Sequence, residues 1–187
     1  MNTKGFAAVF LLAFICRAHA AIIITDLTRL DTDQTGGRNE AIFSSFGGPV
    51  YHDYSFTYTS WPSYLNGAEM VRMVNGDAMD SDYQLQLTLS QPATVYLMID
   101  NRTDTAALPW VSAQGFQNTG DIVMVWDFPY SVYATAASAG TFIVRENARS
   151  LNMYTLAVVP EPSVALHLGV VTVAAFGRRH RSPGHSR

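Results

Sequence analysis

The sequence predicts an all-β fold, an antiparallel two-sheet sandwich that is jelly-roll-like, flanked by an N-terminal signal helix and a C-terminal apolar helix. Three observations lead to this prediction. About eight short runs rich in β-branched and aromatic residues fill the middle of the chain. Gly, Pro, Asn and Ser separate these runs, as in the turns of a sandwich. At each end an apolar run lies beside basic residues, which is typical of targeting segments.

Residues 1–20 have the three parts of a secretory signal peptide in the expected order. Lys4 supplies the positive charge, residues 6–15 form an apolar core, and Ala18 and Ala20 form a small-x-small cleavage site. Cleavage by signal peptidase would leave Ala21 as the first mature residue. The single cysteine lies inside this segment, so the mature chain is expected to contain no disulfide.

Residues 21–158 are predicted to form the β-sandwich domain. The expected strands are residues 21–28, 54–60, 83–89, 93–100, 121–128, 130–136, 141–147 and 153–159. Leucines and glutamines alternate strictly through 83–89, which indicates a strand with one buried face. Whether the runs 83–89 and 93–100 pair with each other or pass between the two sheets stays open. Trp126, within an alternating run, is expected to pack in the core.

The body of the chain is acidic. Between Asp26 and Glu161 it has fifteen Asp and Glu residues, six arginines and no lysine, which gives a net charge of −9. Such a charge argues against nucleic acid as a partner, because phosphate binding depends on clustered Lys and Arg. It is compatible with an exported protein and with cation binding.

The tail, residues 159–187, begins with a proline-rich motif, continues with an apolar segment and ends in basic residues. The motif contains Pro160, Glu161, Pro162 and Ser163, the apolar segment is 164–176, and the basic end contains Arg178, Arg179 and Arg181. As a helix the apolar segment would be about 20 Å long, against a hydrocarbon core of roughly 30 Å. A stable anchor formed by this segment alone is therefore not expected, although with neighbouring residues it could sit in a thin or locally deformed bilayer as an uncut membrane helix, with its arginines on the cytoplasmic side.

This tail resembles the PEP-CTERM sorting signal of Gram-negative bacteria, on the order of its three parts. The resemblance implies recognition by an exosortase-type processing enzyme, cleavage near Pro160 to Ser163, and delivery to the cell envelope or outer surface. It also implies an association with extracellular polysaccharide, because many proteins with this tail belong to bacteria that make such polymers.

Part of the body, from about residue 83 to 158, is similar to a β-rich module attached to secreted bacterial polysaccharide lyases. The shared features are Val95-Tyr96, Asp100, Arg102, Pro109-Trp110, Phe116, Thr119-Gly120 and Ala139-Gly140. Asp100 and Arg102 are two residues apart, so an extended strand would place them on one face, where they can form an ion pair. The resemblance implies a β-rich fold and an extracellular location.

The body contains candidates for two kinds of site. Aromatic rings in loops can stack on sugars, which makes Trp110, Trp61 and Tyr96 candidate carbohydrate contacts; packing in the core is the alternative for each. Acidic turns can bind calcium, either at Asp31 and Asp33 or at the second cluster, Asp77, Asp80 and Asp82. Solvated turns without metal are the alternative there, and no other cofactor is implied.

The sequence thus favours a non-catalytic, exported protein of the cell envelope or extracellular matrix, sorted by an exosortase-type system and associated with extracellular polysaccharide. A carbohydrate-binding module that uses loop aromatics is the first alternative. A small polysaccharide-active hydrolase or lyase is the second, although no catalytic residue can be named, because nothing in the sequence selects one pair of carboxylates.

Overall fold

The computed structural model describes residues 22–31, 39–43 and 48–161. The predicted signal peptide with its cleavage site at Ala18, Ala20 and Ala21 lies outside the described residues. So do Asp33 and the tail from Pro162 onward, including Ser163, the apolar segment 164–176 and the three arginines. Within the described residues, no helix is long and apolar enough to cross a membrane.

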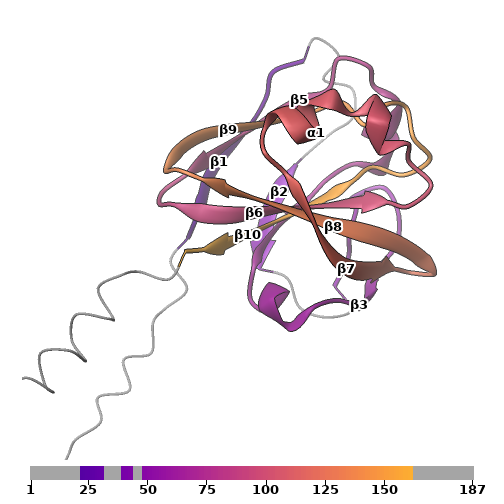
Figure 1. The fold of residues 1–187 in the computed structure, drawn as a ribbon, viewed down its shortest axis with the longest axis horizontal. Helices are drawn as coiled ribbons and strands as arrows, with labels where there is room; N and C mark the ends of the chain where they lie inside the picture. Colours follow the sequence, from indigo (N-terminus) through magenta and orange to yellow (C-terminus); the bar gives the residue numbers. More distant parts are fainter. Residues whose placement is uncertain (1–21, 32–38, 44–47, 162–187) are drawn as a thin grey trace, which may run out of the picture.

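The described chain forms two antiparallel sheets packed face to face, which confirms the predicted β-sandwich (Figure 1). The smaller sheet has the strand order β1-β5-β9 and the larger one the order β2-β4-β10-β6-β8-β7-β3. The strands are β1 (Ile24–Arg29), β2 (Glu40–Phe43), β3 (Tyr58–Ser60), β4 (Glu69–Arg72), β5 (Gln84–Leu89), β6 (Ala93–Asp100), β7 (Gln117–Val125), β8 (Phe128–Ala137), β9 (Gly140–Arg145) and β10 (Thr155–Pro160). Short helical turns join them: η2 (Ser63–Leu65), η3 (Asn75–Met79), η4 (Thr105–Ala107) and α1 (Pro109–Ala113).

The core lies between the sheets and is built by alternation along the strands. In β5, Leu85, Leu87 and Leu89 are buried while the residues between them are half-buried. This is the pattern of a strand with one face toward an apolar core. β5 pairs with β1 and β9, whereas β6 pairs with β8 and β10, so the chain passes from one sheet to the other between them. That settles the alternative left open by the sequence.

The structure differs from the expected set of strands in three respects. β2 and β4 were not predicted, because each has only four residues and β4 has a charged residue at each end. The run 54–60 forms a strand only from Tyr58 onward. The run 121–128 is divided, since β7 ends at Val125 and β8 begins at Phe128.

A buried carboxylate in β4 connects the two sheets. The register of β1 against β5 shifts between Ile24 and Asp26, which interrupts the backbone ladder. Glu69 reaches this point from the larger sheet: its two carboxylate oxygens accept hydrogen bonds from the backbone N–H groups of Ile23 and Ile24, each at 2.7 Å. Glu69 is 2% exposed. Its carboxylate therefore supplies the acceptors that the strand pairing leaves out.

The two ends of the sandwich differ in what they hold. Ala93 pairs with both Pro160 and Ala137 at one end of the larger sheet, and Asp100 pairs with Tyr130 at the other. The first end, at the left of Figure 1, holds the start of β1 and the end of β10. The second, at the right, holds the β7–β8 hairpin and the loops that follow β6 and β9. The loops free to contact a ligand are thus remote from the two described chain ends.

Candidate functional site

The predicted carbohydrate contact Trp110 is part of the core. It lies in α1 and is 6% exposed, packed against the rings of Phe116 and Tyr154. Its indole N–H donates to the carbonyl of Glu146 at 3.0 Å. Pro109 begins the helical turn and so directs the next side chain inward. We therefore withdraw Trp110 as a contact, because its ring faces have no access to a sugar.

Trp61 and Tyr96 are half-buried, and each ring lies against another aromatic ring. Trp61 packs on Tyr58 with ring centroids 5.3 Å apart, and its indole N–H donates to Asn66. Tyr96 stacks on Tyr64 with a centroid distance of 5.1 Å. Contact of either ring with a sugar stays a prediction.

The exposed tryptophan of the body is Trp126, which the sequence placed in the core. It is 54% exposed at the tip of the β7–β8 hairpin. Phe56 packs against it at a centroid distance of 5.1 Å, and Phe128 at 6.5 Å. Tyr54, 50% exposed, extends the group from the other side of Phe56 at 5.3 Å. We call these four residues the aromatic surface.

The backbone of Trp126 is held in an unusual conformation. Its φ is +54°, in the left-handed region, at the first position of a two-residue hairpin loop. Glycine is the residue that normally suits positive φ, because a Cβ atom is crowded there. Hydrogen bonds at both ends of the residue fix it: its N–H donates to Thr57, and its carbonyl accepts from the Thr59 hydroxyl, both at 2.8 Å. A large, half-exposed ring is thus kept where a small residue would be favoured.

A signal in the sequence could have revealed this loop. The two expected strands 121–128 and 130–136 were separated by Pro129 alone. A tight hairpin needs two loop residues, so the turn had to fall inside one of the runs. Trp126-Asp127 was the pair that interrupted the apolar alternation with an acid.

An arginine adjoins the aromatic surface. The guanidinium of Arg102 lies 4.0 Å from the centroid of the Phe128 ring. Asp100, at the end of β6, holds it through two parallel bonds, from Nε at 2.9 Å and from Nη2 at 2.5 Å. The carboxylate is buried and the arginine side chain is 40% exposed. The ion pair that the two-residue spacing predicts is therefore confirmed, and it presents a fixed arginine to solvent.

Buried amides hold Asp100 in turn. The Asn152 side chain donates to Asp100 at 3.0 Å and accepts from the side chain of Asn75 at 3.3 Å. Asn147 donates to the backbone carbonyl of Asn152. Burial works against ionisation, but the hydrogen bonds from Arg102 and Asn152 outweigh it and lower the pKa of Asp100. Arg102 is thus paired with a carboxylate whose own position is fixed by hydrogen bonds.

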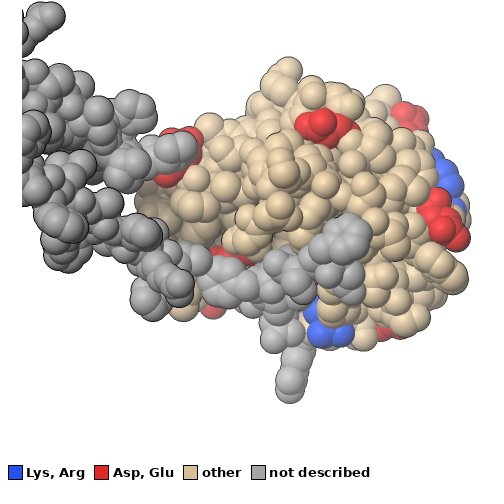
Figure 2. Space-filling view, turned by 90° about the horizontal axis from the view of Figure 1, so that it is seen from below, with Lys and Arg blue, Asp and Glu red and all other residues tan. Residues whose placement is uncertain are grey.

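A cavity of about 270 Å³ opens beside this ion pair, between the loops that follow β6 and β9. Arg102, Thr103 and Asp104 from the first loop and Arg149 and Ser150 from the second line it. The hydroxyls of Thr103 and Ser150 are hydrogen-bonded to each other and so connect the two loops. We call this the arginine cavity. In Figure 2, uncharged residues dominate the visible face, and charged ones are scattered over it with one mixed group at the right-hand edge.

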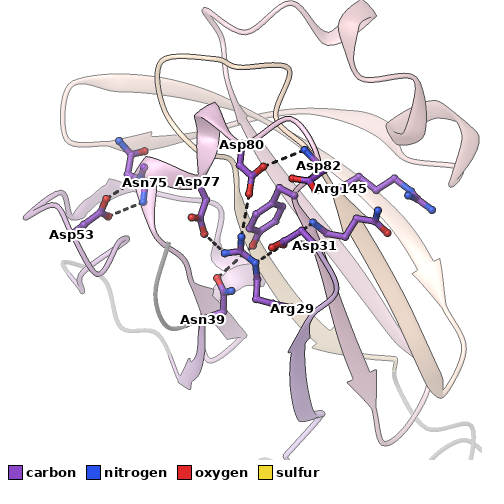
Figure 3. Close-up of polar contacts among 12 residues, drawn as sticks. Arg29, Asp31, Asn39, Asp53, Asn75, Asp77, Asp80, Asp82 and Arg145 are labelled. Atoms are coloured by element: carbon purple, nitrogen blue, oxygen red, sulfur yellow. Dashed lines mark hydrogen bonds and ion pairs between the residues drawn. The ribbon is translucent and has the colours of Figure 1, made fainter. Parts of the chain in front are cut away.

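The two predicted calcium clusters come together around an arginine (Figure 3). The guanidinium of Arg29 contacts Asp31 and Asp77 at 2.6 Å each and Asp80 at 3.3 Å, and it lies 4.4 Å from the centroid of the Tyr83 ring. Asp82 is linked to this group through its backbone N–H, which donates to Asp80 at 3.2 Å.

This arrangement revises the calcium prediction, because Arg29 takes the position that a metal would need. Among the described residues, no group of three or more His, Cys, Asp or Glu side chains is arranged to hold a metal ion. Burial, together with repulsion by Asp31 and Asp80, raises the pKa of Asp77 to about 6 in spite of Arg29. The cluster is a structural connection between β1, η3 and the start of β5.

Known proteins that this chain resembles are carbohydrate-active enzymes. No protein-family model matches the sequence. A β-glucuronidase of Formosa agariphila is 32% identical over 126 residues, which are 60% of this chain and 12% of that protein. The solved structure of a β-glucuronidase from glycoside hydrolase family 2 superposes with a TM-score of 0.63 at 24% identity. That match covers 75% of this chain and 15% of the enzyme.

A second solved structure shows the same fold more distantly. A GH138 enzyme that targets pectin rhamnogalacturonan II has a TM-score of 0.51 and 10% identity over 72% of this chain and 16% of that enzyme. The chain therefore spans roughly an eighth to a sixth of the length of these proteins. It corresponds to one β-rich segment of enzymes that are several times larger.

Proposed function

We propose that this chain is a non-catalytic, exported module that binds extracellular polysaccharide through the aromatic surface. The observation that carries the proposal is the half-exposed Trp126, fixed in a left-handed conformation beside Phe56 and Phe128. Flat rings of this kind offer the apolar face on which a sugar ring can stack. Exposed apolar patches on a monomer mark interaction surfaces.

The comparisons support a carbohydrate-related role of this kind. The similar proteins are named as glycosidases or as an enzyme that targets a pectin, and this chain matches only a small segment of each. A segment that recurs in enzymes of different glycoside hydrolase families has the distribution of an accessory module. Binding of a shared class of ligand is the simplest task for such a module.

Two cavities of the described chain lack the pair of carboxylates that a glycosidase uses. Hydrolysis of a glycosidic bond generally uses two carboxyl groups on opposite sides of the bond. Asp104 is the one carboxylate among the described residues that line the arginine cavity. A neighbouring cavity of about 410 Å³, lined by residues such as Leu108, Val111, Phe116 and Tyr133, has no acidic side chain among its described lining residues. Neither lining includes the pair that a hydrolase would need.

The fold is compatible with export and sorting by the tail. The described chain ends lie together at the end of the sandwich opposite the aromatic surface (Figure 1). A tail held transiently in the membrane would therefore leave the aromatic surface facing away from it. We propose that the PEP-CTERM-like tail is recognised by an exosortase-type enzyme and that the body reaches the cell surface.

Intact-mass measurement tests the export proposal. In a host that has an exosortase, the surface protein is expected to begin at Ala21 and to end near Pro160 to Ser163. A surface species that still includes Arg178 and Arg179 would contradict processing and indicate an uncut anchor instead.

Trp126 provides the test of binding. In affinity gel electrophoresis with a panel of soluble polysaccharides, the wild-type protein is expected to be retarded by at least one polymer. Trp126→Ala is expected to weaken that retardation about tenfold or more, because stacking on an aromatic ring provides a large part of the contact. Met79→Ala, which removes a 61% exposed apolar side chain from η3, is the matched control and should change nothing.

A second substitution separates binding from folding. Trp126→Gly also removes the ring, but it suits the positive φ and should leave the protein at least as stable as Trp126→Ala. The proposal is supported if both variants lose retardation while each still unfolds cooperatively at a Tm close to that of the wild type. Retardation of the wild type that survives in both variants would place the binding site elsewhere, and a wild type that no polymer retards would overturn the proposed function.

A further inference from the structure

The arginine cavity gathers positive charge on an acidic protein. Between Asp26 and Glu161 the chain has six arginines against fifteen acids, and two of those arginines, Arg102 and Arg149, line this one cavity. Arg29, by contrast, is enclosed by three aspartates. An anionic polymer would be repelled by the body as a whole, so any site for one has to present arginine locally.

One edge of the Arg102 guanidinium group is available to a ligand. Asp100 engages the side of the guanidinium that carries Nε and one hydrogen of Nη2. Nη1 makes no hydrogen bond to any described residue, and the side chain is 40% exposed. The planar guanidinium can bind a second oxyanion through this remaining edge with two parallel hydrogen bonds. Since the buried amides hold Asp100, little conformational freedom is lost when a ligand binds.

Arg149 faces the same cavity from a strained turn. Ala148 and Arg149 have φ of +51° and +55°, and the N–H of Ser150 donates to the carbonyl of Asn147 across them. Two consecutive left-handed residues between those bonding partners form the kind of turn that usually takes Asn and Gly. Arg149 is exposed and has no hydrogen bond or ion pair within the described part of the chain. The turn holds this cation at the cavity where a smaller residue would be less strained.

The rest of the cavity suits the hydroxyl groups of a sugar. Thr103 and Ser150 contribute hydroxyls, and Asp104 contributes a carboxylate that also caps η4 through a bond from Ala106. The volume, about 270 Å³, is at the small end of ligand sites and fits one sugar unit better than a long chain. Arg102 joins this cavity to the aromatic surface, because it also covers the Phe128 ring.

We infer that the arginine cavity binds the oxyanion group of an acidic sugar within the polysaccharide that stacks on the aromatic surface. Arg102 and Arg149, from the two loops that line the cavity, bind the anion, while Asp104 and the two hydroxyls contact ring hydroxyls. A carboxylate of a uronic acid and a sulfate ester share this chemistry, and the experiment distinguishes them. This inference rests on the proposed function and adds the class of polymer to it.

The probes are four soluble polymers in affinity gels at moderate salt: polygalacturonate, its methyl ester, dextran sulfate and a neutral dextran. Polygalacturonate is expected to retard the wild-type protein more strongly than its methyl ester, which presents the same ring without the charge. Retardation by dextran sulfate instead would assign the site to sulfate. Equal retardation by polygalacturonate and its ester, with none by dextran sulfate, would overturn the inference.

Arg149→Gly is the decisive variant, because it removes the cation and relieves the backbone at once. Its affinity for the acidic polymer should fall about tenfold or more, since a charge-assisted contact is lost. Its Tm should rise by about 2 to 4 °C, since glycine is free to adopt positive φ. Ala148→Gly is the matched control: it should give a similar rise in Tm and leave the affinity unchanged.

The outcomes separate the inference from the proposed function. If Arg149→Gly binds acidic polymers as tightly as the wild type does, the inference fails while the Trp126 result stands by itself. If Ala148→Gly loses affinity as well, the shape of the turn rather than the charge determines binding, and the inference also fails. Selective loss of acidic polymers in Arg149→Gly, with retention in Ala148→Gly and in Arg149→Lys, supports it.

Discussion

Glu69→Ala is expected to lower the free energy of unfolding by about 3 kcal/mol, since hydrogen bonds to a charged group contribute roughly 1.5–3 kcal/mol each. The carboxylate is 2% exposed and accepts from the N–H groups of Ile23 and Ile24, at the register shift of β1. The substitution leaves both N–H groups in the interior without this acceptor and removes a side chain that connects the start of β1 to the larger sheet.

Urea unfolding monitored by tryptophan fluorescence measures this effect. Glu69→Gln, which keeps one carbonyl oxygen, should fall between the wild type and alanine. Asp127→Ala removes an exposed acid at the β7–β8 loop and should change stability by less than about 0.5 kcal/mol, as is usual for surface positions. A loss below about 1 kcal/mol in Glu69→Ala, less than one charged hydrogen bond contributes, would show that the start of β1 is held by other contacts.

Asp100→Ala is expected to destabilise the protein by about 2 kcal/mol, because it removes a buried carboxylate that accepts hydrogen bonds from the amide of Asn152 and from the half-exposed guanidinium of Arg102. The carboxylate accepts four hydrogen bonds, three from Arg102 and one from Asn152. Without it, the Asn152 amide and the guanidinium lose a buried acceptor, and Arg102 loses its fixed orientation over Phe128. The variant should therefore lose affinity for acidic polymers as well as stability.

A double-mutant cycle with Arg102→Ala isolates the pair. The double variant should be less destabilised than the sum of the two single variants, since neither partner is then left without the other. Additive losses would show that the two side chains act independently, and that Asp100 contributes through Asn152 and the backbone N–H of residue 102.

The stability profile at low pH gives a second check on Asp100. Its pKa is lowered in the folded protein, so its stabilisation is present above the ordinary pKa of 3.8 and is lost as the pH falls through the folded value. Asp77 acts in the opposite sense: its pKa of about 6 makes the folded state bind the extra proton, so its contribution declines as the pH rises from its ordinary pKa of 3.8 to about 6. Because Asp77 is present in both proteins, the difference between wild type and Asp100→Ala should shrink only below the ordinary pKa of 3.8.

The sequence indicated the fold through features that are local. Alternation in residues 83–89 and the β-branched runs around them are consequences of a two-residue repeat, which any half-buried strand shows. β5, β6, β8, β9 and β10 accordingly lie close to their predicted positions. β2 and β4 escaped prediction because a four-residue strand has too little pattern to detect, above all where charged residues stand at its ends.

The candidate site could be predicted only in part, and particular residues show why. The spacing of Asp100 and Arg102 predicted their ion pair, although Arg102 lies in the turn after β6 and not on the strand itself. Trp110 and Trp126 lie opposite to their expected positions, because the two are equally apolar and a ring in either place can be buried or exposed. Which of them is exposed depends on the hairpin register at Val125 and Phe128 and on the helical turn after Pro109.

By itself the sequence determined the β class, the approximate strands, the acidic body without lysine, and the pairing of Asp100 with Arg102. Only the tertiary structure decided that Trp126 is exposed, that Arg29 takes the centre of the predicted calcium clusters, and that Arg149 and Arg102 line one cavity. The physical reason is the distance in sequence between the partners. Residues 29 and 77, like residues 102 and 149, come together only when the two sheets pack and their loops fold over one end of the sandwich. A local sequence pattern contains no information about such long-range neighbours.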